Sequence, residues 1–438
     1  MTVARALRPV ALSVLMALSS VATTTAGADV PPVSRHVLPN GMTILVRESR
    51  GARVVAVSLQ VAGGAAYETP ATAGITNFVH RTMVRGTMRL SAMKLAEAAE
   101  DLGGGVDGSG DVDHAEIRAH ALAGRWQALL DLVAEVALTP SFPADEVERT
   151  RRLILGQIRA REDTPRDFGM DTMMRSLYGA HPYALPALGT RETIVSIGRD
   201  ALVDHYRRVY RPDRMVLAVS GDVPGDRVAK HVERRFGKLP AQPREPETAL
   251  PEPSPEGGRR VVIRPAQQAQ VLIGFVGPRL ADADYAATKL LVAIIGGGMA
   301  GRLFQEIRER QGLAYSVGVL NPSRVGPSAI VSSLGTEGPN IDAAESSVKR
   351  ELARVRSEPP SEDELTRAKA YVLGMMAMDR RTNGRQAWYL AFFELVGAGW
   401  DFPARYARAM DGVTAADVVR AAERHFERPT IVIVEPAK

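Results

Sequence analysis

The stretch "DALVDHYRRVYRPDRMVLAVSGD", Asp200–Asp222, decides how this chain is organised. Its pattern predicts an amphipathic helix, a turn at Pro212 and then a buried strand. A second unit of the same kind, "AADVVRAAERHFERPTIVIVEP", lies near the end of the chain as Ala415–Pro436. Val203 and Val419 take matching places in the two helices and are 216 residues apart.

The same spacing recurs in a second pair of segments. "VVAVSLQV" (54–61) and "AQVLIGFV" (269–276) align with Val55 on Val271, again 216 residues apart. One spacing at two separate places indicates an internal duplication. Chance similarity between two α+β domains is the alternative, because helix–turn–strand units are common.

The segment between the two copies is typical of a linker. "LPAQPREPETALPEPSPEGG", residues 239–258, is rich in Pro and Glu and poor in apolar residues. Such a segment is stiff and extended. We therefore predict an N-terminal domain over 29–238 and a C-terminal domain over 259–438.

Strand-like and helix-like runs are mixed within the first copy. "HAEIRAHAL" (114–122) alternates apolar and polar residues as a half-buried strand does, whereas "GRWQALLDLVAEVAL" (124–138) has helical periodicity. Ser91 is placed to cap another helix. These runs predict an α+β fold with two homologous domains, each a largely antiparallel sheet with helices on one face.

The N-terminus has the pattern of a secretory signal. Arg5 and Arg8 precede the apolar run 9–22, and Ala26-Gly27-Ala28 is a cleavage-site pattern. We predict that residues 1–28 are removed and that the protein is secreted across the inner membrane into the periplasm; an uncleaved N-terminal anchor is the alternative. No other segment is long and apolar enough to predict a membrane span.

Composition excludes several classes of function. The chain has 438 residues, a formal charge of +5 and no cysteine, which excludes disulfides, cysteine zinc sites and thiol nucleophiles. Lys and Arg are scattered and form no basic stripe with interleaved aromatic residues, so nucleic acid is not an expected partner.

The helix predicted from "AGITNFVHRTMVRGT" (73–87) resembles a zinc-binding helix in its spacing, but its ligand positions hold other residue types. An inverzincin places two His at i and i+4, where both reach one metal ion, and a Glu at i+3. Here these positions hold Asn77, Arg81 and His80. Asn is a poor ligand and Arg is a permanent cation that repels a divalent metal.

No other chemical site stands out. His114 and His120 share one face of a predicted strand, but no carboxylate pattern accompanies them, and surface or core histidines explain them as well. The glycine-rich loop Gly296, Gly297, Gly298 lacks the Gly-Lys-Ser/Thr ending of a phosphate loop, and a flexible connection explains it equally.

Several stretches in order resemble the pitrilysin/insulinase/mitochondrial processing peptidase family of inverzincin zinc peptidases. They are "LPNGMTILVRES", "AGITNFVHRTMVRGT", "LGGGVDGSGDVDHAEIRAHAL", "YGAHPYALPALGTRETI" and "GGGMAGRLFQEIRERQGLAYSV". The resemblance covers nearly the whole chain after residue 28 and implies a clamshell of two homologous domains.

The resemblance also shows which functional positions have changed. The family's two zinc histidines fall on Asn77 and Arg81, its catalytic Glu on His80 and its third ligand, a Glu, on Gln157. The supporting acidic residue falls on Thr150. The resemblance therefore implies an abandoned zinc site, with no metal and no cofactor in this chain.

The second domain keeps the family's substrate-binding pair. The Arg and Tyr that hold the substrate backbone fall on Arg308 and Tyr315, and Arg N–H groups and a Tyr hydroxyl suit a peptide carbonyl. In contrast, "DGSG" (107–110) replaces the family's Asn-Ala-x-Thr strand, so substrate pairing at that edge is doubtful.

The resulting hypothesis is a non-catalytic, substrate-binding subunit of a heterodimeric zinc metallopeptidase. Its expected partners are a catalytic subunit of the same family, which would carry the zinc, and peptide substrates. The alternatives are a self-sufficient peptidase with a rearranged metal site that includes His80, and a peptide-binding scaffold without a catalytic role.

Overall fold

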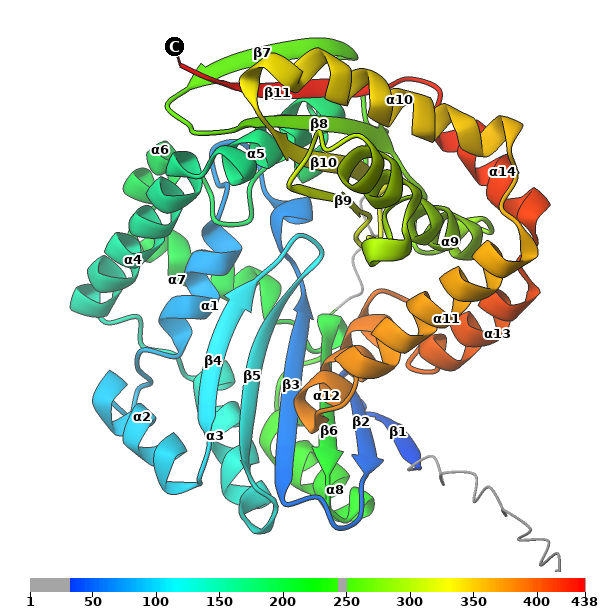
Figure 1. Ribbon diagram of the computed structural model, residues 1–438. Coiled ribbons are helices and arrows are strands. Elements are labelled where there is room, and N and C mark those ends of the chain that lie inside the picture. The colour runs from blue at the N-terminus through cyan, green and yellow to red at the C-terminus, as the bar shows by residue number, and fades with distance from the viewer. Residues whose placement is uncertain (1–31, 243–249, 438) are drawn as a thin grey trace, which may run out of the picture. The chain divides into compact units, whose positions relative to one another are not determined.

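The computed structural model describes residues 32–242 and 250–437 (Figure 1). The predicted signal peptide, residues 1–28, lies outside these ranges, as does the middle of the predicted linker. Within the described ranges, no helix has the length and apolar character that crossing a membrane requires.

The first sheet has six strands in the order β1-β2-β6-β3-β5-β4. Neighbouring strands are antiparallel except β2 and β6, which run parallel. Strand β6, the last strand of this sheet in chain order, therefore lies inside the sheet, and β1 and β4 form its edges. The strands are β1 (Val33–Val37), β2 (Thr43–Glu48), β3 (Val54–Ala62), β4 (Gly105–Gly110), β5 (His114–Leu122) and β6 (Met215–Gly221).

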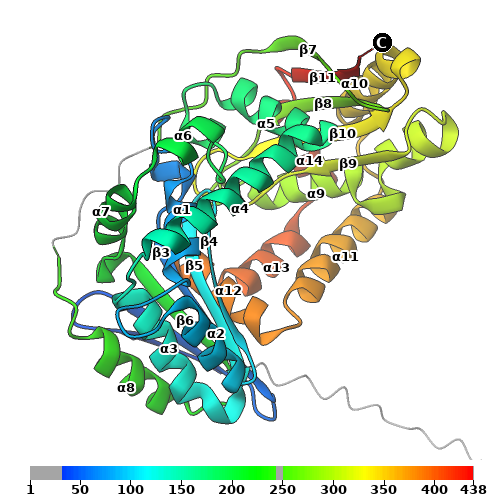
Figure 2. The same cartoon turned by 90° about the vertical axis from the view of Figure 1, so that its left-hand side faces the viewer.

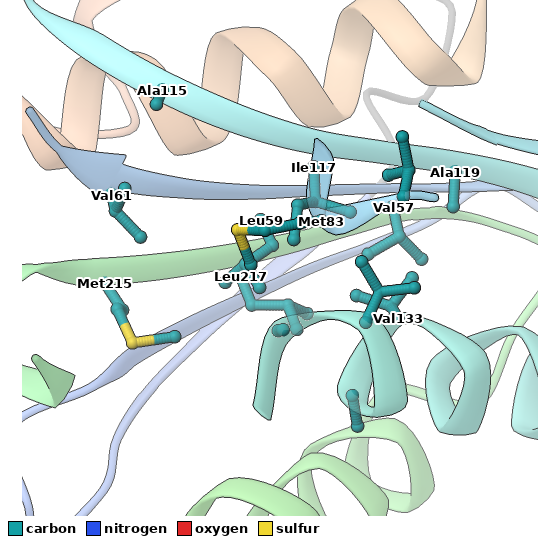
Figure 3. Close-up of a cluster of buried hydrophobic side chains, with 14 of the residues drawn as sticks. Val57, Leu59, Val61, Met83, Ala115, Ile117, Ala119, Val133, Met215 and Leu217 are labelled. Atoms are coloured by element: carbon teal, nitrogen blue, oxygen red, sulfur yellow. The ribbon is translucent and has the colours of Figure 1, made fainter. Parts of the chain in front are cut away.

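Helices cover one face of this sheet. Alternate residues of β3, such as Val57 and Leu59, point toward Met83 of α1 and Val133 of α3, and all four are buried (Figure 3). Burial of each such side chain stabilises the fold by roughly 1.5–3 kcal/mol. The helices of this half are α1 (Ile75–Met83), α2 (Ala92–Asp101), α3 (Trp126–Leu138), α4 (Ala144–Asp163), α6 (Arg191–Ser196), α7 (Arg199–Val209) and α8 (Gly225–Phe236).

The second sheet repeats the plan of the first. Its order is β7-β11-β8-β10-β9, and only β7 and β11 are parallel. Strand β11 lies between a parallel and an antiparallel neighbour, as β6 does, which confirms the predicted α+β fold with two homologous sheets. The strands are β7 (Gly258–Arg264), β8 (Ala269–Val276), β9 (Ser316–Leu320), β10 (Ala329–Thr336) and β11 (Thr430–Pro436).

The second half also buries one face of its sheet under helices. Residues Phe304–Arg310, whose apolar periodicity is that of an ordinary helix, form a π-helix, η6. π-Helical turns are rare in proteins, and those that occur often lie at functional sites. The α-helices are α9 (Tyr285–Gly296), α10 (Ile341–Ser357), α11 (Glu362–Asp379), α13 (Phe402–Gly412) and α14 (Ala415–His425).

The two halves exchange a helix. Helix α5 (Pro165–Tyr178), from the first half, packs on β8 and β11 of the second sheet, whereas α12 (Asn383–Leu395) packs on β3 and β6 of the first (Figures 1 and 2). Met173 and Leu272 share one core cluster, and Leu390 and Ala218 share another. Each strand therefore lies with its own half, but these two helices pack with the opposite one.

Candidate functional site

The residues at the family's three zinc-ligand positions meet in space. Asn77 and Arg81 lie one turn apart on α1, and Gln157 projects from α4, which packs against α1. Arg81 Nε donates to Asn77 Oδ1 at 3.2 Å, and Arg81 Nη1 donates to Gln157 Oε1 at 2.7 Å. The guanidinium of Arg81 thus bridges the two amide side chains.

This arrangement does not fit a zinc ion. A zinc ligand needs a free lone pair, whereas a guanidinium offers donors only. Burial lowers the pKa of Arg81 and the nearby Asp107 opposes that shift; an arginine nevertheless stays protonated in proteins. A fixed positive charge therefore occupies the place where the resemblance puts a metal ion.

His80, at the position of the catalytic Glu, is enclosed in the protein. It is 0 % exposed, its Nδ1 lies 2.8 Å from the carbonyl oxygen of Thr76, and its ring stacks on Tyr210 with centroids 5.6 Å apart. Burial lowers its pKa to about 4. Its Nε2 has no hydrogen-bond partner within the described residues. A neutral, enclosed imidazole has no route to a substrate, so His80 is not placed as a general base.

No alternative metal cluster accompanies His80. Among residues 32–242 and 250–437, no group of three His, Asp or Glu side chains is placed to hold a metal ion. His114 packs edge-on against Trp388 and Phe392, while His120 lies further along β5. Thr150, at the position of the supporting acid, is 3 % exposed and its hydroxyl lacks a partner within the described residues.

The "DGSG" segment forms a regular strand, β4, although glycine is a poor strand former. Glycine is needed here because β4 lies in close contact with α1. A Cβ atom on Gly108 would lie 2.1 Å from the carbonyl oxygen of His80, and one on Gly110 would lie 2.7 Å from the backbone nitrogen of Asn77. Both glycines are therefore required by the packing of α1.

The outer edge of β4 is partly occupied by side chains of the same chain. The N–H of Gly108 donates to Asp107 Oδ1 at 2.9 Å, and the N–H of Gly110 donates to Asn77 Oδ1 at 3.3 Å. A peptide that adds as a strand needs such backbone donors. An incoming strand would have to displace both bonds.

The two residues of the proposed substrate pair lie together in the second half. Arg308 is in the π-helix η6, and Tyr315 directly precedes β9. The Arg308 guanidinium carbon lies 5.3 Å from the centre of the Tyr315 ring and 4.8 Å from that of Phe304. Tyr315 is 75 % exposed and the side chain of Arg308 is 39 % exposed. Both side chains are accessible to a ligand.

The glycine-rich loop has a packing explanation. A Cβ on Gly296 would lie 2.4 Å from Val319 of β9, and Gly298 has a φ of +65°, which favours glycine. The loop allows α9 to end against β9 and the chain to turn into η6.

The structure contains a large cavity that the sequence did not predict. It has a volume of about 840 Å³ and lies on the face of the first sheet beside the start of α12. Its walls come from β3, from the paired strands β4 and β5, and from residues 381–388 at the start of α12, which the exchange of α12 brings against this sheet. The lining residues are Arg53, Val54, Ala56, Val57, Gly105, Val106, Asp107, Glu116, Arg118, Ala119, His120, Arg381, Thr382, Asn383, Gly384, Arg385 and Trp388.

Two models of one peptidase family match the chain. Residues 43–191 match the model described as Insulinase (Peptidase family M16), and residues 196–372 match that described as Peptidase M16 inactive domain. The chain is 27 % identical to an uncharacterized zinc protease of Bacillus subtilis, covering 81 % of this chain and 86 % of that protein. It is 33 % identical to an uncharacterized zinc protease of Mycobacterium leprae, covering 65 % of each.

Solved structures share the fold. A protease from Helicobacter pylori superimposes with a TM-score of 0.86 at 20 % identity, covering 93 % of this chain and 100 % of that one. A peptidase M16 inactive domain from Pseudomonas fluorescens superimposes with a TM-score of 0.85 at 22 % identity, covering 93 % and 98 %. At these identities the likeness concerns the fold alone.

Proposed function

This chain belongs to the insulinase family, peptidase family M16, and we propose that within it the chain is the non-catalytic, substrate-binding subunit of a secreted heterodimeric zinc metallopeptidase. The observation that carries the proposal is the contrast between its two halves. Arg81 bridges Asn77 and Gln157 where a metal would lie, whereas Arg308 and Tyr315 stay together and exposed.

The contrast supports a division of labour. A peptidase of this kind needs a metal-activated water as nucleophile and a separate set of donors for the peptide carbonyl. Arg308 and Tyr315 are suited to bind the peptide carbonyl. The residues at the metal-ligand positions are instead hydrogen-bonded to one another. A chain of this composition would contribute to peptide hydrolysis only beside a subunit that supplies the metal.

The proposal specifies the partner and the location. The partner is a family member of similar length with an intact His-x-x-Glu-His helix, and it holds the zinc, while this chain holds no metal or other cofactor. Peptides are the substrates. The signal pattern in residues 1–28 supports export to the periplasm.

The experiment compares three preparations: this chain, a co-encoded family member with His-x-x-Glu-His, and their mixture. Each is analysed for zinc content by mass spectrometry and for cleavage of an unstructured fluorogenic peptide. We expect little activity and no stoichiometric zinc in this chain alone, and the highest activity in the mixture. Robust activity with one zinc per isolated chain would instead support a self-sufficient peptidase.

Two variants test the substrate pair in the mixture. Arg308→Ala and Tyr315→Phe remove donors to the peptide, and we expect each to lower kcat/KM by about tenfold or more, since single donors to a developing oxyanion are worth 10²–10³-fold. Arg310→Ala, which removes an exposed arginine of the same π-helix, is the matched control. If the mixture is inactive but the chain binds peptides, the chain is a scaffold without a catalytic role.

A further inference from the structure

The cavity beside α12 is a consequence of incomplete helical cover. One face of the first sheet presents Ala56 of β3, His120 of β5 and Gly105 of β4 in one cross-strand row. Helix α12 covers β3 and β6, so that Ala56 is buried, but it begins only at Asn383 and leaves His120 and Gly105 accessible. Since Ala and Gly have the smallest side chains, the row forms a hollow, which explains the 840 Å³ of space.

The second half of the chain, which has the same plan, has no cavity of this size at the corresponding place among the described residues. In the second half, α5 takes the place of α12, and the corresponding space between α5, β8, β10 and β9 has a volume of about 340 Å³. The larger cavity falls in the range of sites that hold a small ligand or part of a peptide.

Arginines dominate the charge of the cavity. Arg53, Arg118, Arg381 and Arg385 line it, against the carboxyls of Asp107 and Glu116. Two of the four arginines are already paired: Arg118 with Asp107, and Arg385 with Asp379. In the part of the chain that the structure describes, Arg53 and Arg381 form no ion pair with a carboxylate, and Arg381 Nε donates to the carbonyl oxygen of Met378 at 2.7 Å.

The chain segments that carry Arg53 and Arg381 lie side by side at the cavity. Asn383 Nδ2 donates to the carbonyl oxygen of Val54 at 2.8 Å, so the segment that carries Arg381 lies beside the segment that carries Arg53. Both side chains are exposed. The first turn of α12 lies there too, and the N-terminus of a helix adds positive potential.

The rest of the cavity wall combines the ion pair of Arg118 and Asp107 with Trp388, the buried Glu116 and small apolar residues. The ring of Trp388 forms one wall and carries the Arg385 guanidinium, whose carbon lies 4.3 Å from the ring centre. Glu116 is 6 % exposed and accepts from Ser58 Oγ at 2.5 Å. Burial raises the pKa of the Glu116 carboxyl.

We propose that this cavity binds an extended peptide segment that places an apolar side chain against Trp388 and a neighbouring carboxylate between Arg53 and Arg381. The inference rests on the proposed function, because it names the class of substrate that this subunit selects: acidic, apolar peptides. The carboxylate is that of an Asp or Glu side chain or that of the peptide's C-terminus.

The test measures binding of fluorescein-labelled nonapeptides to this chain alone by anisotropy. One peptide carries Leu and Phe flanked by Glu, a second replaces each Glu by Lys, and a third replaces Leu and Phe by Ser. We expect the first to bind at least tenfold more tightly than the others. Equal affinities for all three would overturn the proposal.

Two changes in the protein test the two parts of the cavity. Arg53→Glu with Arg381→Glu reverses the charge, and Gly105→Leu fills the hollow, where a Cβ meets only His120 at an ordinary 3.5 Å. We expect each to weaken the first peptide at least tenfold. Arg428→Glu and Gly124→Leu, at an exposed arginine and an open glycine, are the matched controls. Unchanged affinity in both cavity variants would overturn the proposal.

Amidation of the first peptide distinguishes the sources of the carboxylate. Loss of affinity on amidation means that the arginines bind the free C-terminal carboxylate. Unchanged affinity means that they bind Glu side chains, and both results support the proposal. Because these measurements need no catalytic subunit, their failure is independent of the mixture experiment, which tests the proposed function.

Discussion

Arg81 and Gln157 are 76 residues apart in the sequence, and Arg81 Nη1 lies 2.7 Å from Gln157 Oε1 in space. The bond joins α1 to α4, the two helices that carry the family's zinc-ligand positions. In this chain the connection that a metal would provide is made by a positive side chain. The packing of α1 on α4 therefore requires no metal ion.

The first prediction is that the metal site can be rebuilt. Asn77→His, Arg81→His and Gln157→Glu together remove the fixed cation and supply two imidazoles one turn apart plus a carboxylate, the donor set that zinc accepts. We expect the triple variant to bind about one zinc per chain, as measured by mass spectrometry and by the visible spectrum after cobalt substitution. Arg81→His alone should bind none, and metal binding by that single variant would contradict the role given to the other two positions.

The second prediction concerns the glycines of β4. Gly108→Ala puts a methyl group 2.1 Å from the carbonyl oxygen of His80, so backbone must move. We expect a loss of about 1–3 kcal/mol or more in the free energy of unfolding, the usual range for overpacking. Gly156→Ala, within α4 with no atom within 4 Å, should instead stabilise the protein by about 0.5–1 kcal/mol. Urea unfolding of the two variants gives the comparison, and equal effects would contradict the close contact.

The third prediction is a stability loss in acid caused by buried histidines. Burial lowers the pKa values of His80 and His114 from 6.5 to about 4. Between these pH values the unfolded chain binds protons that the folded chain does not, so this contribution is complete above pH 6.5 and falls as pH is lowered toward 4. The slope is up to about 1.4 kcal/mol per pH unit for each histidine.

Variants isolate this contribution from that of the carboxyl groups. The free energy of unfolding is measured between pH 7.5 and pH 5 for the parent chain and for His80→Phe, which keeps a ring against Tyr210. We expect a shallower pH slope in the variant. Leu153→Ala, at an exposed, non-titrating position of α4, should keep the parent slope. An unchanged slope in His80→Phe would show that His80 does not titrate differently in the two states.

The fourth prediction concerns a buried network that connects the two halves. Tyr183 Oη donates to Asp113 Oδ1 at 2.5 Å and accepts the N–H of Gly326 at 2.7 Å. Arg324 Nη1 lies 3.7 Å from Asp113 Oδ2. Tyr183→Phe leaves both partners short of a bond, and we expect a loss of about 1–3 kcal/mol in the free energy of unfolding. Tyr371→Phe, at a 42 % exposed tyrosine, should change it little; equal effects in urea unfolding would contradict the network.

Much of the fold is visible in local patterns. The alternation in "HAEIRAHAL" became β5, with Ala115 and Ile117 in the core, and Ser91 caps α2 by accepting from the backbone N–H of Lys94. These features depend on residues a few positions apart, where periodicity and capping chemistry act. The π-helix at η6 was not predicted, because its residues have ordinary helical periodicity.

At the candidate site, too, residue types could be read from the sequence, whereas contacts between distant residues could not. The change of zinc ligands to Asn77, Arg81 and Gln157 is plain from residue types, since neither an amide nor a guanidinium replaces imidazole or carboxylate as a zinc ligand. The hydrogen bonds among them are not. The glycines of "DGSG" were expected to weaken a strand, whereas β4 pairs regularly with β5, and α1 leaves no room for larger side chains at Gly108 and Gly110.

By itself, the sequence determined the duplication and the α+β elements, and it predicts the loss of the zinc ligands, because each follows from residue types and short-range spacing. Only the tertiary structure decided that Arg81 joins α1 to α4, that α5 and α12 pack on the opposite sheets, and that Arg53 and Arg381 meet at one cavity. The physical reason is that a helix buries its apolar face wherever a complementary sheet face is open, and no local pattern states which sheet that is.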